Sequence, residues 1–140
     1  MSEFQGKVVI VTGSSSGIGE SIARRLADLG ATVVVNSSSS VEAGEAVAKS
    51  LPNGAIYVRA DISKKEEALN LLEQTIKAFG KLDILVNNAG IQHVSRIEDF
   101  PPERWDAVLA INLSSAFHTS RLALPAMRAA NWGRIINIAS

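Results

Sequence analysis

Short runs of apolar, mostly β-branched residues alternate along the chain with segments in which apolar residues recur every three or four positions. The short runs predict strands at residues 8–11, 32–35, 55–58, 82–86 and 134–138, and the periodic segments between them predict amphipathic helices. The first run, Val-Val-Ile-Val, is apolar at every position, as expected of a parallel strand buried on both faces. This alternation predicts an α/β fold, a doubly wound parallel sheet of five strands in the order 3-2-1-4-5 with helices on both faces.

Two helical segments carry more specific expectations. Ser63 followed by Glu66 is a capping-box pattern and predicts a helix that begins directly after Ser63. The apolar stripe of that helix is expected in the core: Leu69, Leu72, Ile76 and Phe79. A long helical stretch is predicted from about residue 103, and Pro125 is expected to kink or end it. The residues expected on its inner faces are Trp105, Val108, Leu109, Asn112, Leu113 and Phe117.

Composition narrows the class of protein. A length of 140 residues suits one domain over residues 1–140, and 46% apolar with 20% charged residues indicates a folded, soluble chain. Since 14 Lys and Arg balance 14 Asp and Glu, nothing in the charge supports binding to nucleic acid or to an anionic membrane. Cysteine is absent and His93 and His118 lack companions at ligand spacing, so no metal site is expected. Without a signal-peptide pattern or a membrane-spanning apolar run, a cytoplasmic location is the default expectation.

The first predicted strand runs into a glycine-rich turn, Gly13-x-x-x-Gly17-x-Gly19, which opens an amphipathic helix. Missing side chains allow a tight turn and close backbone approach, and the helix N-terminus offers free N–H groups to a pyrophosphate. Such a turn can also exist without a ligand, but its place between strand and helix favours a dinucleotide cofactor. The turn residues expected to contact the cofactor are Gly13, Ser15, Ser16, Gly17, Ile18 and Gly19.

Four more motifs follow the glycine turn in order: Asp61, Asn87-Asn88-Ala89-Gly90, Asn112 and Ile138-Ala139-Ser140. Together with the turn, they resemble the short-chain dehydrogenase/reductase family over all 140 residues. The resemblance implies a Rossmann-like domain that binds NAD or NADP and transfers hydride between the nicotinamide and a carbonyl or alcohol carbon.

The resemblance also implies roles for individual residues. Asn112 is expected to hold a water chain that leads to a catalytic lysine, and Ser140 is expected to hydrogen-bond the substrate carbonyl or hydroxyl. Asn87 is expected to brace the central strand. The residues expected to contact the adenine and its ribose are Asp61, Ile62, Asn88, Ala89 and Gly90.

The general acid/base of this family is a tyrosine, and a lysine four residues later lowers the pKa of its phenol. Tyr57 is the only tyrosine of the chain and has no lysine four residues later, so it cannot fill this role. The pair is expected shortly after Ser140, and we therefore expect a chain truncated at the active-site serine, without the C-terminal strands of the family. Two interpretations stay open: an NAD(P)-dependent oxidoreductase, or a catalytically inactive dinucleotide-binding fragment.

The second half of the chain is similar to bacterial 3-hydroxybutyrate dehydrogenases, in Gly90-Ile91-Gln92-His93-Val94 and in residues 98–101, 110–118 and 132–140. This similarity implies a small hydroxy acid or ketone as substrate, Gln92 as the residue that holds its carboxylate, and a homotetramer as the assembly. A 3-oxoacyl-thioester reductase or a sugar dehydrogenase remains an alternative parent.

The choice between NAD and NADP depends on the residues that follow the second strand. Asn36 and Ser37 stand in the region where NAD-specific sites place a carboxylate and NADP sites a basic residue, and both are expected to contact the cofactor. Neither side chain is charged, so the choice stays open. The similarity to the hydroxybutyrate enzymes leans toward NAD, whereas the missing acid leans toward tolerance of NADP.

Overall fold

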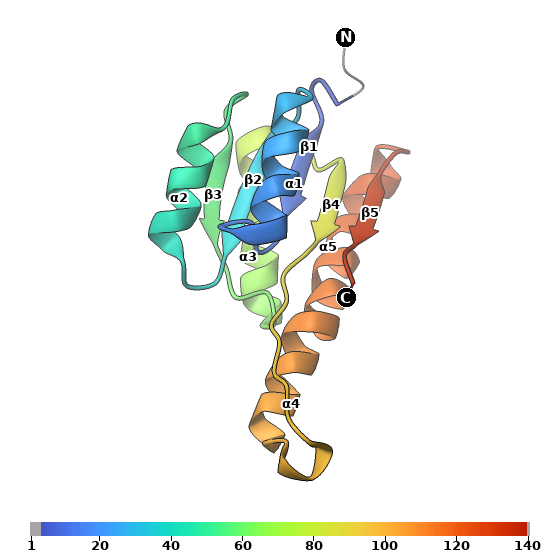
Figure 1. The fold of residues 1–140 in the computed structure, drawn as a ribbon. Coiled ribbons are helices and arrows are strands. Elements are labelled where there is room, and N and C mark those ends of the chain that lie inside the picture. The colour runs from blue at the N-terminus through green and yellow to red at the C-terminus, as the bar shows by residue number, and fades with distance from the viewer. Residues whose placement is uncertain (1–3, 140) are drawn as a thin grey trace.

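A five-stranded parallel sheet in the order β3-β2-β1-β4-β5 forms the centre of the computed structural model, which describes residues 4–139 (Figure 1). The strands are β1 (Val8–Val11), β2 (Thr32–Ser37), β3 (Ile56–Arg59), β4 (Ile84–Asn87) and β5 (Arg134–Asn137). Each neighbouring pair is parallel. The predicted fold and strand order are therefore confirmed, and β2 extends beyond its apolar run to include Asn36 and Ser37.

Helices cover both faces of this sheet. The pair α1 (Gly17–Asp28) and α2 (Val41–Ser50) lies on one face, and α3 (Lys65–Phe79) and α5 (Ser115–Ala129) lie on the other (Figure 1). Side chains of β1 alternate between the two layers, since Val9 and Val11 pack in the cluster with α1 and α2 while Ile10 packs in the cluster with α3 and α5. All three are fully buried. Burial on both faces explains why every position of β1 is apolar.

The long helical stretch predicted from about residue 103 is present and runs from Pro102 to Ala129, with a π-helical segment inside it. The connection from β4 to α5 comprises a 3₁₀ turn η1 (Ile97–Asp99), the helix α4 (Pro102–Leu109) and a π-helical segment η2 (Ala110–Ser114) that continues into α5. Pro125 lies inside α5 and does not end it. Figure 1 shows α4 extending away from the sheet, and α4 contains no buried residue. The expected inner face is consequently wrong at five positions that are exposed: Trp105, Leu109, Asn112, Leu113 and Phe117.

The predicted start of α3 is also wrong. The helix begins at Lys65, and Ser63 does not cap it because its hydroxyl donates to Asp61 Oδ1 over 2.6 Å. Glu67 Oε1 accepts the Asp61 N–H over 2.9 Å, a bond back to the preceding turn that Glu66 was expected to make. The expected capping box is therefore absent, and these side-chain bonds stabilise the turn before the helix instead.

The predicted apolar stripe of α3 is correct only in part. Leu72 is buried, whereas Leu69 and Ile76 are exposed because the helix turns Leu71 and Thr75 toward the sheet. The Thr75 hydroxyl donates to Leu71 O over 2.8 Å, so this polar residue is satisfied inside its own helix. Within residues 4–139, no helix has the length and apolar character needed to cross a membrane.

Candidate functional site

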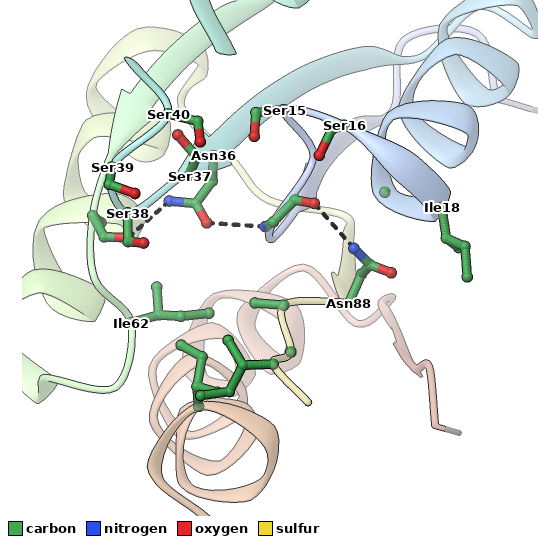
Figure 2. A pocket seen from close by; sticks show the side chains of 17 residues that line it. Ser15, Ser16, Ile18, Asn36, Ser37, Ser38, Ser39, Ser40, Ile62 and Asn88 are labelled. Atoms are coloured by element: carbon green, nitrogen blue, oxygen red, sulfur yellow. Dashed lines mark hydrogen bonds between the residues drawn. The ribbon is translucent and has the colours of Figure 1, made fainter. Parts of the chain in front are cut away.

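The carboxyl ends of β1, β2 and β4 meet at the edge of the sheet where the strand order reverses, which is where open α/β sheets bind ligands. Two cavities lie there. The β2-side cavity, of about 330 Å³, is drawn in Figure 2, and the β5-side cavity has a volume of about 450 Å³. Both are lined by Ile18 and by residues 88–91, so they adjoin along a common wall and form one cleft.

The glycine turn forms the α1 end of this cleft. Gly13 has a φ of +61°, and a Cβ there would lie 2.9 Å from Ala89 Cα, so the position requires glycine on two grounds. A Cβ on Gly19 would overlap the Gly13 carbonyl oxygen and the Asn88 amide. The turn is therefore pressed against residues 88–90, and both glycines are needed for contacts within the protein.

The N-terminus of α1 supplies hydrogen-bond donors to the cleft. The helix begins at Gly17, and the N–H groups of its first turn, which include those of Ile18 and Gly19, have no partner within the helix. Ser16 occupies the N-cap position without a side-chain capping bond. Since Ser16, Ile18 and Gly19 line the β2-side cavity, these donors and the positive end of the helix dipole lie at its wall.

Asn36 and Ser37 line the same cavity, yet the polar atoms of both side chains bond to the protein. Asn36 is 1% exposed, and its Oδ1 accepts the Gly13 N–H over 3.2 Å (Figure 2). Its Nδ2 donates to Val58 O over 3.1 Å and to Ala60 O over 3.2 Å. The Ser37 hydroxyl lies 2.6 Å from the Tyr57 hydroxyl. The exposed hydroxyls of the rim are instead those of Ser38, Ser39 and Ser40.

The opposite wall is fixed to the end of β1 by Thr12, a fully buried residue that was not among the predicted cofactor contacts. Thr12 Oγ1 accepts the N–H of Asn88 over 2.9 Å and that of Ala89 over 3.0 Å. The Asn88 amide donates to Thr12 O and Gly13 O, each over 3.1 Å. A polar residue directly after an apolar strand was the available signal for this role.

The predicted adenine contacts separate in the structure. Ile62 is 1% exposed and lines the β2-side cavity, whereas Asp61 and Gly17 are not among the described residues that line it. Asp61 Oδ1 accepts the backbone N–H of Ser63 over 3.1 Å in addition to its hydroxyl. Asp61 thus shapes the turn that presents Ile62, and Gly17 provides the positive φ of +60° at which α1 begins.

Two of the residues predicted for the substrate side, Gln92 and Asn112, line the β5-side cavity, and Ala139 lines it beside them. Asn112 lies in the π-helical segment η2, a feature often found at functional sites. Its Oδ1 accepts the Ile91 N–H and its Nδ2 donates to Ile91 O, each over 2.8 Å. Asn112 therefore clamps the backbone next to Gln92. Ser140, the predicted active-site serine, lies outside the described residues.

The buried side-chain amide of Asn87 connects the end of β4 to β5 and to α5. Thr119 Oγ1 donates to Asn87 Oδ1 over 2.6 Å, and Asn87 Nδ2 donates to Asn137 Oδ1 over 2.9 Å and to Ser120 Oγ over 3.3 Å. Thr119 is fully buried and Asn87 is 7% exposed. The Asn87 side chain therefore ties the end of β4 to β5 and α5, not to the central strand β1, and its partners carried no signal in the sequence.

No charged side chain lines either cavity among the residues that the structure describes. Within residues 4–139, no group of three His, Cys, Asp or Glu side chains is placed to hold a metal ion. The cleft therefore offers backbone N–H groups, hydroxyls, amides and a few apolar side chains. This set suits an elongated ligand whose negative charge can lie at the N-terminus of α1.

Comparisons with known proteins agree with this geometry. The profile of the family described as short chain dehydrogenase matches residues 7–140. The D-beta-hydroxybutyrate dehydrogenase of Cupriavidus necator is 55% identical over 139 residues, which cover 98% of this chain and 54% of that protein. The enzyme of the same name from Rhizobium meliloti is 47% identical over 138 residues, or 96% of this chain and 54% of the relative. An uncharacterized oxidoreductase of Thermotoga maritima is 39% identical over 139 residues, 98% of this chain and 55% of its own length. The chain spans about half the length of the curated relatives it matches.

Proposed function

The chain belongs to the short-chain dehydrogenase family, and from that premise we propose that its cleft binds a nicotinamide dinucleotide. The observation that carries the proposal is the continuity of the two cavities across Ile18 and residues 88–91, directly beside the N-terminus of α1. A dinucleotide has two nucleoside halves joined by a pyrophosphate. The cleft has two compartments joined at a helix N-terminus, which is the matching arrangement.

Each compartment has residues for one half of such a ligand. The first-turn N–H groups of α1 would hold the pyrophosphate, and Ile62 would pack against the adenine in the β2-side cavity. Asn88, Ala89 and Gly90 would line the ribose, since they form the wall shared by both compartments. The nicotinamide would then occupy the β5-side cavity, beside Gln92 and Asn112.

We propose NAD as the preferred cofactor, with NADP tolerated. The rim of the β2-side cavity presents the hydroxyls of Ser38, Ser39 and Ser40, with neither a carboxylate to repel a 2′-phosphate nor a cation to attract one. Calorimetric titration with NADH and NADPH tests the cofactor proposal. We expect both to bind and NADH to bind more tightly by no more than about ten-fold, a difference of about 1.4 kcal/mol. Binding of neither at millimolar cofactor would refute the proposal.

The reaction we propose is hydride transfer between the nicotinamide and a small hydroxy acid or ketone such as 3-hydroxybutyrate. The two relatives named D-beta-hydroxybutyrate dehydrogenase support this substrate class. The bound nicotinamide would supply or accept the hydride. Gln92 would hold the substrate carboxylate, Ser140 would hydrogen-bond the reacting oxygen, and Asn112 would keep the Gln92 segment in place through Ile91.

A dinucleotide-binding chain without turnover of its own is the second candidate, and the position of Tyr57 favours it. The Tyr57 ring packs against Gly44 of α2, where a Cβ would overlap it, and its hydroxyl is paired with Ser37. No other tyrosine exists among the 140 residues to act as general acid/base. With NAD and 3-hydroxybutyrate, we expect the 140-residue polypeptide to produce no change in nicotinamide absorbance. Turnover that is lost on Ser140→Ala would contradict this expectation.

A further inference from the structure

Ser14 and Asn36 form a reciprocal hydrogen-bonded pair behind the glycine turn. The Ser14 N–H donates to Asn36 O over 2.8 Å, and the Asn36 N–H donates to Ser14 Oγ over 3.0 Å. The Ser14 hydroxyl in turn donates to Val11 O over 2.7 Å. Both residues are almost completely buried, at 0% and 1% exposed. Through these bonds the pair connects Val11, the last residue of β1, to Asn36 of β2. This connection is additional to the backbone pairing of the two strands.

The Asn36 side chain extends this pair to the glycine turn and to β3. One amide group serves three backbone partners, namely the Gly13 N–H on one side and the carbonyls of Val58 and Ala60 on the other. Asparagine is suited to this place because its amide combines an acceptor with two donors. An aspartate would face the two carbonyls with an acceptor, and an alanine would remove the partner of two buried carbonyls and of the part-buried Gly13 N–H.

We infer that Asn36 is a positioning residue, which sets the conformation of the glycine turn for the cofactor without contacting the cofactor through its own polar atoms. The inference rests on the proposed function, because the turn matters only if a dinucleotide binds there. Asn36 occupies the Gly13 N–H, so this N–H is not available to the pyrophosphate. The donors that remain for the pyrophosphate are those at the start of α1, and the turn held by Asn36 determines where they lie.

The same bonds explain why the side chains at the end of β2 do not provide a charge that distinguishes NAD from NADP in this chain. Asn36 faces inward, and the Ser37 hydroxyl is paired with Tyr57. Binding to an already ordered turn avoids the cost of ordering it, so loss of the Asn36 bonds is expected to appear as loss of cofactor affinity.

The test compares Asn36→Ala with a matched control, Asn53→Gly. The Asn53 amide also donates to two backbone carbonyls, Ala27 O over 3.0 Å and Ala31 O over 3.2 Å. It lies between α2 and β3, at the amino end of the sheet and away from the cleft, and its φ of 69° makes glycine the neutral replacement. Hydrogen exchange at the Gly13 and Ser14 amides and titration with NADH are measured for both variants.

For Asn36→Ala we expect faster exchange at Gly13 and Ser14 and at least about a ten-fold increase in the Kd for NADH, as follows from unpaired buried groups. For Asn53→Gly we expect neither change. If Asn36→Ala does not fold, Ser14→Ala, which removes the acceptor of the Asn36 N–H and the donor to Val11 O, is expected to change both quantities in the same direction by a smaller factor.

The outcomes separate this inference from the proposed function. Unchanged NADH affinity in a variant with faster Gly13 exchange would overturn the positioning role, as would an equal loss of affinity in Asn53→Gly. A wild-type chain that binds neither NADH nor NADPH would overturn the proposed function and the positioning role together. The exchange rates would in that case still report whether Asn36 orders the turn.

Discussion

The two ends of the cleft differ in how completely the described residues enclose them. On the β2 side, β1 and β2 are buried under helices on both faces, and Val9, Val11, Val33 and Val35 have no exposed surface. On the β5 side, Ile136 is 46% and Ile138 is 40% exposed. The α4 helix next to this side has no buried residue and extends away from the sheet.

This difference indicates which residues the proposed cofactor binding depends on and which residues the proposed substrate binding depends on. The β2-side cavity is set by backbone groups and by amides whose hydrogen bonds are satisfied within residues 4–139, so its shape follows from this chain alone. The β5-side cavity depends on the Asn112 clamp and on the segment after β5, which are exposed. We therefore expect cofactor binding and substrate binding to respond to different substitutions.

Gly19→Val should have the largest effect and should act on the β2 side. Even a Cβ at this position overlaps Gly13 O and the Asn88 amide, so a branched side chain must displace the turn from residues 88–90. We expect a loss of about 3 kcal/mol in the free energy of unfolding, together with loss of NADH binding. Chemical denaturation and calorimetry measure the two effects. Gly54→Ala is the control, since Gly54 has a φ of +77° but no neighbour within 4 Å, and only the smaller backbone strain is expected.

Asn87→Ala should act across the boundary between the two sides. The substitution removes one acceptor of the buried Thr119 hydroxyl, which keeps its bonds to Ser115 O and Ala116 O, and it removes the donor to the Asn137 amide oxygen. It should cost about 2 kcal/mol of stability. Hydrogen exchange is expected to increase in β5 more than in β2. Thr75→Val is the control, because the Thr75 hydroxyl is buried as deeply as that of Thr119 but bonds only within its own helix. Equal exchange in β2 and β5 would contradict the proposed division of the cleft.

The features that could be predicted from the sequence are those that a pattern of several residues specifies. Strand order and the two-sided burial of β1 follow from apolar runs, because a parallel sheet leaves little choice about which positions face helices. The glycine turn was predictable because Gly13 and Gly19 have no room for a side chain. These are local patterns with one physical solution.

The features that could not be predicted depend on single hydrogen bonds between distant residues. The position of Thr12 after an apolar strand and of Asn36 at the end of β2 could mark them as candidates, but their bonding partners are backbone groups that only the fold brings near. The failure at Ser63 has a similar cause, because Asp61 competes for the hydroxyl that would have capped α3. Periodicity also misplaced Trp105 and Phe117, since it identifies an apolar face without showing what covers that face.

Asn112→Ala tests whether the β5-side cavity can be changed without changing the β2-side cavity. It removes both hydrogen bonds to Ile91 at an exposed position, so we expect a loss of about 1 kcal/mol in stability and faster exchange at the Ile91 amide. NADH affinity should change much less than in Gly19→Val. Asn112→Asp keeps the acceptor for the Ile91 N–H but not the donor to Ile91 O, and should give an intermediate exchange rate. Protection of Ile91 that is unchanged in both variants would show that Asn112 is not the clamp.

Ile136→Lys should have the smallest effect on stability and a clear effect on association. β5 is an edge strand, and its outer backbone groups together with the exposed Ile136 and Ile138 form a surface suited to pairing with another chain. We expect the 140-residue chain to self-associate at micromolar concentration and to become more monomeric when Ile136 is replaced by lysine.

The stability change for this substitution should stay within about 0.5 kcal/mol, since the side chain is half exposed. Ile97→Lys is the matched control, because Ile97 is 90% exposed but lies in the η1 turn next to α4 and not in a strand. Sedimentation velocity distinguishes the two routes to association. If Ile97→Lys disperses the chain and Ile136→Lys does not, association proceeds through the α4 region, and the open edge of β5 is protected by its own twist or by neighbouring side chains. A wild-type chain that sediments as a monomer would contradict both routes, because neither apolar surface would then be sufficient to bind a second chain.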